Sequence, residues 1–409
     1  MLGEVLKAFD LPPEFWASLV GCSEEQFHEW TSSQRELPLS LARRFSSLTG
    51  IDAGTLLRRP KGNEDPLSLI PPLWLKAREE NLSEGARKAI AIAQLVGSKY
   101  TEIAELTDSQ SDAYKNLFAD IKTRHDLRSP ARKQGESSAL AFLSLSGLGT
   151  GARGIGEVLR GHLRARGVLV LEMSIVSRDV EGFCLPIGSR AGSRPCLIAN
   201  GYRATWFRRN FVILHELAHA IFDLDGSGAT FDVGADAEAG DSLKSLAEER
   251  ANSFAQHVLV PKRMLVNLES TGLRLLGANK ESLAQIVAAS HAEQRTIVRA
   301  ALEYGLIDEA EARRLLDLDI ASDLRRVSDH AKDLSSTPPG YVIDQDFRRW
   351  KNRETSFPIE GIRLPIPFVS MVVSAFRDQK ISYGKAADLL MATDEELSSQ
   401  YGLEPEFAT

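Results

Sequence analysis

Apolar side chains recur at three- and four-residue intervals along most of the chain, which is the spacing of amphipathic helices. One part of the chain departs from this spacing and carries short apolar runs separated by Gly, Ser and Arg, as is typical of strands. These runs are VLVLEMSIV (168–176), EGFCLPI (181–187) and RPCLIAN (194–200). The pattern predicts a mainly helical α+β fold with one small β-sheet.

Further helices are expected on both sides of these strands. RGIGEVLRGHLRARG (153–167) predicts an amphipathic helix before them. After them, FVILHELAHAIFD (211–223) has the pattern of a buried helix, and LKSLAEERANSFAQHVLVP (243–261) predicts a helix stopped by its proline. The segment between these two helices, GSGATFDVGADAEAGDS (226–242), is rich in Gly and Asp and predicts a loop.

Length and breaker residues divide the chain into regions. A chain of 409 residues is too long for one ordinary core and suggests about two to four compact units. RRPKGNEDPLSLIPP (58–72) and RSPARKQGESS (128–138) read as linkers, and STPPG (336–340) as a break. We expect an N-terminal helix-turn-helix domain (1–60), a linker and helical connector (61–140), a domain with the strands and a following helical bundle (141–310), and a helical C-terminal region (311–409). The last region is interpreted as a packing appendage or a homodimer interface.

Composition narrows the class of protein and the kind of site. Hydrophobic residues make up 43% and charged residues 26% of the chain, the balance of a globular protein. The net charge of −7 argues against bulk attraction to nucleic acid or anionic membrane, so any DNA contact has to be local. Without an apolar stretch of about 18 residues or a secretory leader, we expect a cytoplasmic protein with no membrane partner. The three cysteines lack CxxC spacing, which leaves His and carboxylate side chains as expected metal ligands.

The helix expected at 211–223 carries three polar groups among apolar neighbours. His215, Glu216 and His219 form an H-E-x-x-H pattern, whose four-residue step places both imidazoles on one helix face. Unpaired buried charges there would cost several kcal/mol, and a zinc ion held by the two histidines would compensate for them. Glu216 is then within reach of the attacking water as general base. The pattern predicts a zinc-dependent hydrolytic site.

A catalytic zinc needs a third protein ligand, and the sequence offers three candidates. Glu248 on the next helix gives a gluzincin arrangement, with Asn252 one turn later able to orient the neighbourhood by hydrogen bonding. Asp225 has the spacing of a metzincin ligand, but the glycine that this motif requires is missing. His257 is a lone histidine on a mostly apolar helix, where such a residue more often packs in the core. We favour Glu248 and the gluzincin arrangement; Glu249 points about 100° away on a helix, so the two glutamates cannot serve equally.

The two helices together carry a family resemblance. RRNFVILHELAHAIFD (208–223) followed by AEERANSFAQHVLVP (247–261) resembles the ImmA/IrrE family of zinc metallo-endopeptidases, in which an H-E-x-x-H helix precedes E-x-x-x-N-x-F-A. The resemblance covers about residues 140–310 and implies a zincin-like metallopeptidase core. The residues that it assigns are the zinc ligands His215, His219 and Glu248 and the catalytic acid/base Glu216.

The resemblance also implies a protein substrate. In this family the expected substrate is a transcriptional repressor or an antitoxin-like partner, cleaved in response to stress or to a mobile element. Two other functions stay open. One is a DNA-binding regulator that uses the peptidase fold as a sensor or scaffold, and the other is an antitoxin that neutralises a toxin by stoichiometric binding.

The N-terminal segment WASLVGCSEEQFHEW (16–30) predicts two short helices with a turn at Gly21, where Ser23 caps the second helix in a capping box. ImmA/IrrE proteins often carry an XRE-type helix-turn-helix, which the longer segment WASLVGCSEEQFHEWTSSQRELPLSLARRFSSLTGI (16–51) resembles. The expected recognition helix (23–30) holds three glutamates and no Lys or Arg, so it would repel phosphates. Contact with double-stranded DNA therefore competes with a protein-interaction role. The candidate DNA-binding residues are Gln26, His28, Arg35, Arg43 and Arg44.

Overall fold

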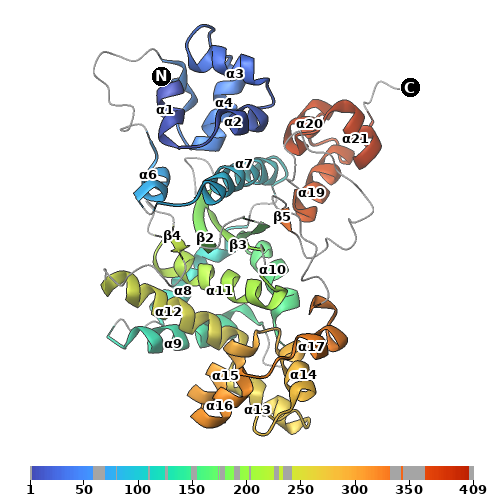
Figure 1. Cartoon of the computed structure of the whole chain (residues 1–409). Helices are drawn as coiled ribbons and strands as arrows, with labels where there is room; N and C mark the ends of the chain where they lie inside the picture. The colour runs from blue at the N-terminus through green and yellow to red at the C-terminus, as the bar shows by residue number, and fades with distance from the viewer. Residues whose placement is uncertain are drawn as a thin grey trace.

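A five-stranded mixed β-sheet lies across the middle of the molecule, with helices on both faces (Figure 1). The structure is a computed structural model that describes residues 2–58, 70–79, 81–108, 111–124, 128–148, 154–173, 175, 180–187, 194–201, 204–224, 230–233, 242–331, 342–343 and 364–404. Among these residues, no helix is both long and apolar enough to cross a membrane. The predicted α+β fold, mainly helical with a small sheet, is confirmed.

The strands lie in the order β4-β2-β3-β1-β5. β1 and β3 are parallel, and the other neighbours are antiparallel. Their bounds are β1 (Leu169–Met173), β2 (Val180–Ile187), β3 (Arg194–Asn200), β4 (Thr230–Val233) and β5 (Val342–Ile343). β1 and β3 fall within the predicted apolar runs, and β2 begins one residue before its predicted run.

Two strands lie where the sequence predicts none. β4 occurs inside the segment predicted as a loop (226–242), and β5 occurs in the C-terminal region predicted as helical (311–409), so both predictions are wrong at these residues. β4 and β5 hold four and two residues, too short for a periodic apolar pattern to appear. They are strands because their backbones pair with β2 and β1, respectively.

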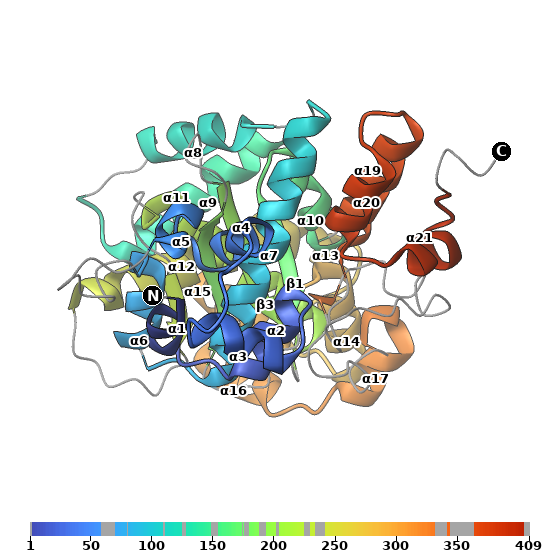
Figure 2. The ribbon, with the colours of Figure 1, turned by 90° about the horizontal axis from the view of Figure 1, so that it is seen from above.

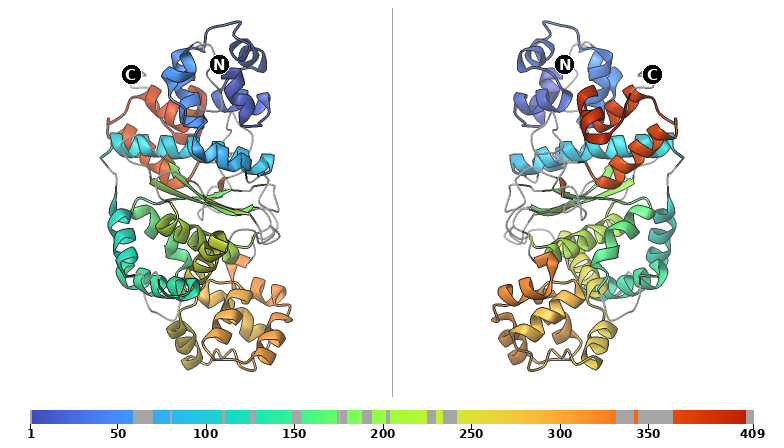
Figure 3. Two further views of the ribbon diagram at one scale, coloured as in Figure 1. Left: turned by 90° about the vertical axis from the view of Figure 1, so that its left-hand side faces the viewer. Right: turned by 90° about the vertical axis from the view of Figure 1, so that its right-hand side faces the viewer.

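Side chains of the sheet alternate between two hydrophobic cores. Leu171 of β1 belongs to the core on one face, and Val170 belongs to the core on the other. Figure 3 shows the sheet edge-on, with α7 (Glu84–Leu106) on one side and α11 (Trp206–Phe222) and α12 (Ser242–Leu259) on the other. Because both faces are covered, the strands read in the sequence as continuous apolar runs.

The first face carries helices from both ends of the chain. A Cβ on Gly97 of α7 would lie 2.6 Å from Ile187 Cδ1, so this glycine lets α7 pack closely on β2. N-terminal and C-terminal helices cover α7 and share one core with it (Figure 2). Lys99 of α7 lies 3.3 Å from the Asp388 carboxylate of α20. These helices are α1 (Leu2–Ala8), α2 (Pro13–Val20), α3 (Glu24–Thr31), α4 (Leu39–Thr49), α5 (Ala53–Leu57), α6 (Pro72–Glu79), α19 (Ile366–Arg377), α20 (Tyr383–Leu390) and α21 (Asp394–Tyr401).

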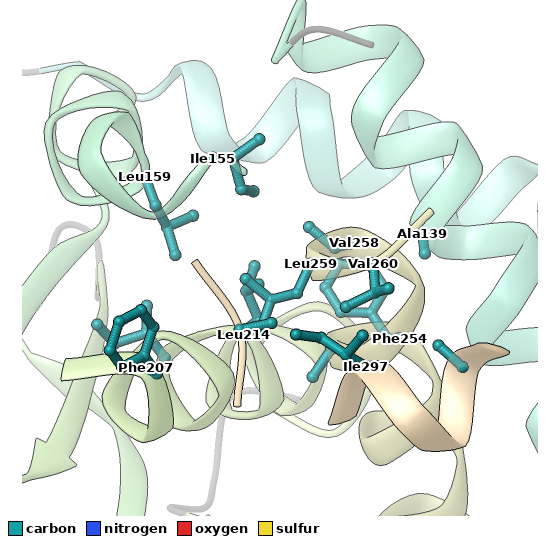
Figure 4. Close-up of a cluster of buried hydrophobic side chains, with 14 of the residues drawn as sticks. Ala139, Ile155, Leu159, Phe207, Leu214, Phe254, Val258, Leu259, Val260 and Ile297 are labelled. Carbon is teal, nitrogen blue, oxygen red and sulfur yellow. The ribbon is translucent and has the colours of Figure 1, made fainter. Parts of the chain in front are cut away.

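The second face carries the larger helical layer. Figure 4 shows part of its core, including Leu214 of α11, Phe254 of α12 and Ile297 of α15. A bundle of short helices extends this layer away from the sheet (Figure 1). The remaining elements of this side are α8 (Ala113–Thr123), α9 (Ala131–Ser146), α10 (Gly156–Ala165), α13 (Lys262–Ser270), α14 (Lys280–Ser290), α15 (Gln294–Glu303), α16 (Glu309–Leu316), α17 (Ala321–Val327) and the 3-10 helix η2 (Asp329–Ala331).

The prediction of a linker at 128–138 is wrong, because most of this segment belongs to helix α9. The helix begins at Ala131, and it packs directly on α12. A Cβ on Gly135 would lie 2.4 Å from the Arg250 carbonyl oxygen and 2.7 Å from Ser253 Cβ. Small and polar residues occur here because two helix backbones approach closely, not because the segment is a solvated linker.

The N-terminal helix pair has the predicted local structure. α2 ends at Gly21, whose φ of 73° lies in the left-handed region that favours glycine. The Ser23 hydroxyl accepts from the Gln26 backbone N–H, and the Gln26 side chain accepts from the Ser23 N–H. The predicted capping box is therefore confirmed.

Candidate metal centre

Helix α11 carries the H-E-x-x-H motif into the second core. Thr205 caps the helix by accepting a hydrogen bond from the Arg208 backbone N–H. The three motif side chains are almost fully buried: His215 and His219 are 2% exposed, and Glu216 is 0% exposed. Polar groups this deep in a core need compensating partners.

A buried ion pair anchors the start of α11. Arg160 of α10 donates to both carboxylate oxygens of Glu172 in β1, at 2.6 and 2.8 Å. The same guanidinium donates to Asn210 Oδ1 of α11 at 2.6 Å, and Asn210 Nδ2 donates to the His291 carbonyl oxygen at 2.9 Å. Charge-assisted hydrogen bonds of this kind fix α11 relative to β1, α10 and the end of α14.

Glu248 of α12 meets the two histidines of α11. His215 Nε2 lies 3.1 Å from Glu248 Oε2, and His219 Nε2 lies 3.3 Å from Glu248 Oε1. The two Nε2 atoms are 3.0 Å apart. Ligands about 2.0–2.1 Å from a tetrahedral zinc ion lie about 3.3 Å from one another. Two imidazole nitrogens and one carboxylate at this spacing fit a zinc ion and leave one position open.

The opposite ring nitrogens of both histidines are held by side chains. His219 Nδ1 lies 2.7 Å from Asp223 Oδ2, and Arg250 in turn donates to the other Asp223 oxygen. Since the carboxylate accepts, Nδ1 of His219 carries a hydrogen, and Nε2 is the nitrogen that faces the cluster. His215 Nδ1 lies 3.2 Å from Asn252 Oδ1. Partners in these positions orient metal-binding histidines.

Glu216 projects toward the sheet. A Cβ built on Gly182 of β2 would lie 2.9 Å from Glu216 Oε1 and 2.5 Å from Val212 Cγ1. The absence of a side chain at Gly182 therefore makes the space in which the Glu216 carboxylate lies. Glycine inside a strand often marks such a close approach, but the type of group that approaches cannot be read from the sequence.

Charges around the cluster favour a cation. Burial lowers the pKa of His219, but hydrogen bonds to Asp223 and Glu248 and the charge of Glu216 raise it to about 10. Burial raises the pKa of Glu248, but hydrogen bonds from His215 and His219 bring it well below its ordinary value. A group of carboxylates that holds a proton this firmly on an imidazole also attracts a metal cation.

Neither of the other candidates that the structure describes joins this cluster. Asp225 is outside the described residues. Glu249 is exposed on α12, away from the two histidines. His257 belongs to a different cluster, together with Glu136 and Glu303. The sequence interpretation missed Asp223 and Arg250; the position of Asp223, four residues after the second motif histidine, was the available signal.

Three of the five N-terminal candidates for DNA contact interact with other residues of the chain. Gln26 completes the capping box of α3. Arg35 lies 3.4 Å from Glu29, and Arg44 donates to the Val20 carbonyl oxygen and lies 3.8 Å from Asp388. The remaining two candidates, His28 and Arg43, are exposed.

Residues 163–315 match the family model Peptidase_M78, described as the IrrE N-terminal-like domain. The matched region runs from α10 to α16 and includes both helices of the His and Glu cluster. This match supports the resemblance to the ImmA/IrrE family and a metallopeptidase-family function for the region. It does not extend to the N-terminal helices, whose XRE-type resemblance stays a prediction. The chain matches no curated protein.

Proposed function

We propose that the chain is a zinc-dependent endopeptidase. The observation that supports this best is the convergence of His215 Nε2, His219 Nε2 and the Glu248 carboxylate next to the buried Glu216. The family match covers the same helices and supports the proposal independently.

His215, His219 and Glu248 would hold the ion. When bound, zinc supplies Lewis-acid chemistry, which makes a water molecule more acidic and polarises the scissile carbonyl. Glu216 accepts a proton from the attacking water on a carboxylate oxygen and then donates it to the leaving amine nitrogen. Its close approach to Gly182 of β2 limits the space in which that carboxylate can move.

Three polar residues have positioning roles in this proposal. Asp223, held by Arg250, fixes the ring of His219, and Asn252 fixes the ring of His215. Fixed rings keep both Nε2 atoms directed at the same point. Binding of the ion therefore does not have to overcome the entropy cost of ordering the two side chains.

The proposed substrate is a protein, either a transcriptional repressor or an antitoxin-like partner in a stress or mobile-element response. Support comes from the resemblance to the ImmA/IrrE family and from the family match. Such partners act in the cytoplasm, and we place the reaction there. The free cysteines Cys22, Cys184 and Cys196 agree with a reducing compartment.

A direct test compares new protein N-termini in cells that produce the wild type or Glu216→Gln. The wild type should generate one or a few cleavage products that the variant does not generate. Glu249→Gln, a change of the exposed neighbour on α12, is the matched control and should cleave like the wild type. Identical N-termini in wild type and Glu216→Gln would refute the proposal.

A second candidate function is a DNA-binding regulator that uses the peptidase domain as a scaffold. The helix pair α2 and α3, with its left-handed Gly21 and capping box, favours it. The acidic first turn of α3 and the internal contacts of Arg44 oppose it. A regulator of this kind would keep its function in Glu216→Gln and would bind a defined operator in a salt-dependent manner.

A further inference from the structure

A second cluster of His and carboxylate side chains lies where α9 and α15 pack against α12. Glu136 of α9, His257 of α12 and Glu303 of α15 each offer one ligand atom, and these atoms lie within 4.8 Å of one another. His257 follows Glu248 by nine residues (257 minus 248), which is about 2.5 helical turns. The two clusters therefore use opposite faces of α12. Figure 4 shows part of the neighbouring core, to which Ala139 of α9, Phe254 of α12 and Ile297 of α15 belong.

The hydrogen bonds of His257 determine which ring nitrogen is available. His257 is 3% exposed, and its Nδ1 lies 2.8 Å from the Ser253 carbonyl oxygen. A carbonyl can only accept, so Nδ1 carries a hydrogen and Nε2 is the ring nitrogen that remains for a metal ion. Nε2 has no hydrogen-bond partner among the described residues and lies 3.6 Å from Glu303 Oε1. A buried ring nitrogen that faces carboxylate oxygens without a hydrogen bond requires a cation between them, either a proton on the ring or a metal ion.

The arrangement is suited to a metal ion. Metal-binding histidines commonly donate their second ring N–H to a backbone carbonyl, as His257 does to Ser253. The Glu136 and Glu303 side chains are 28% and 16% exposed, so an ion can reach the cluster from solvent. One imidazole nitrogen and two carboxylate oxygens form a donor set that suits Zn²⁺ or Mn²⁺, with water completing the coordination.

We propose that Glu136, His257 and Glu303 bind a second divalent cation, which ties α9 and α15 to α12. This site goes beyond the proposed peptidase reaction and uses none of its ligands. Because α12 also supplies Glu248, the cation would brace the helix that carries the third ligand of the first cluster.

Two surface cations compete for the same carboxylates. Arg132 donates to Glu303 Oε1 at 2.9 Å and lies 2.7 Å from its Oε2, and Lys133 lies 2.6 Å from Glu136 Oε2. Arg132 and Lys133 are 54% and 65% exposed, so each can turn into solvent when an ion binds. The cationic ends of these pairs lie in solvent, which weakens the attraction to the carboxylates. The second cation is therefore expected to bind less tightly than the first.

The test counts bound metal. Chelator-treated protein is titrated with Zn²⁺ alone and, in parallel, with Mn²⁺ alone, and the bound ion is measured after free ion is removed. The wild type should bind a second ion that is lost in Glu136→Gln and in Glu303→Gln, whereas Glu248→Ala should keep it. Glutamine preserves shape at two partly exposed positions, and unchanged melting temperatures would confirm folding. Glu249→Gln is the matched control and should keep both ions.

Arg132→Ala gives a result that a purely structural ion-pair network would not produce. Removal of the competing guanidinium should lower the Kd of the second ion about two- to fivefold. The second site would be overturned if neither Zn²⁺ nor Mn²⁺ binds beyond the first cluster. It would also be overturned if Glu303→Gln binds as many ions per chain as the wild type. Either result would leave the first cluster intact, so failure here is distinguishable from failure of the peptidase proposal.

Discussion

The two clusters on α12 resemble each other in composition but differ in how they are built. The first takes His215 and His219 from one helix and Glu248 from a second, and these side chains approach to 3.0–3.3 Å. The second takes one side chain from each of three helices, and its His257 Nε2 lies 3.6 Å from Glu303 Oε1. In the first cluster both imidazoles point at a common carboxylate, whereas in the second one imidazole faces two carboxylates.

The polar side chains that surround the two clusters also differ. In the first cluster, the neighbouring polar groups Asp223 and Asn252 contact the far side of the rings and leave the convergence point to an ion. In the second, Arg132 and Lys133 already neutralise the carboxylates from the surface. If both clusters bind metal as proposed, preorganised ligands with outward-facing partners should bind the ion tightly, and ligands shared with surface cations should bind it more weakly.

The largest expected effect separates chemistry from metal binding. Glu216→Gln should lower kcat/KM of the peptidase about 10²–10⁴-fold, because a positioned general base is lost while the ligands remain. Bound zinc should stay unchanged at both clusters. Cleavage of the identified substrate and metal content are measured on the same preparation. Loss of zinc together with activity would assign Glu216 to metal binding instead of proton transfer.

A smaller effect is expected from the residue that orients His219. Asp223→Asn should weaken zinc binding at the first cluster about 10–100-fold and leave the second cluster unchanged. Competition with a zinc chelator measures the change in affinity. Asp317→Asn, at the exposed end of α16, is the control and should have no effect. An equal loss at both clusters would indicate general destabilisation instead.

The smallest effect tests the close packing of α9 on α12. Gly135→Ala should lower the free energy of unfolding by about 1–3 kcal/mol, since its Cβ would overlap the backbone of α12. It should also weaken the second cluster, whose Glu136 lies next in the sequence. Gly161→Ala, in a helix with no atom within 4 Å of the added Cβ, is the matched control and should be neutral or stabilising by up to about 1 kcal/mol. Both are measured by denaturant unfolding, and equal effects would contradict the packing argument.

The difference between the clusters also explains what could be predicted from the sequence. The first cluster is visible because its two histidines lie four residues apart on one helix and Glu248 lies within a recognisable second pattern. In the second, Glu136 precedes His257 by 121 residues (257 minus 136), and Glu303 follows it by 46 (303 minus 257). No local period connects such residues, so only the packing of α9, α12 and α15 brings them together.

In the fold, too, some elements could be predicted from the sequence and others could not. Helices with a full apolar stripe and strands buried on both faces were predicted, because burial determines their patterns. Helix α9 was interpreted as a linker, because close contact with α12 requires Gly135 and other small residues, which resemble loop composition. β4 and β5 were missed because tertiary pairing, and not their own few residues, makes them strands. Gly182 beside Glu216 carried no signal beyond a glycine in a strand.

The most direct measurement is zinc content in a Glu303→Gln background, where only the first cluster can be counted. We predict one zinc ion per chain in this protein, loss of that ion when Glu248→Ala is added, and its retention when Glu249→Ala is added instead. A protein that binds no zinc when the ion is supplied, or in which the two added changes have the same effect, would contradict a zinc site built from His215, His219 and Glu248.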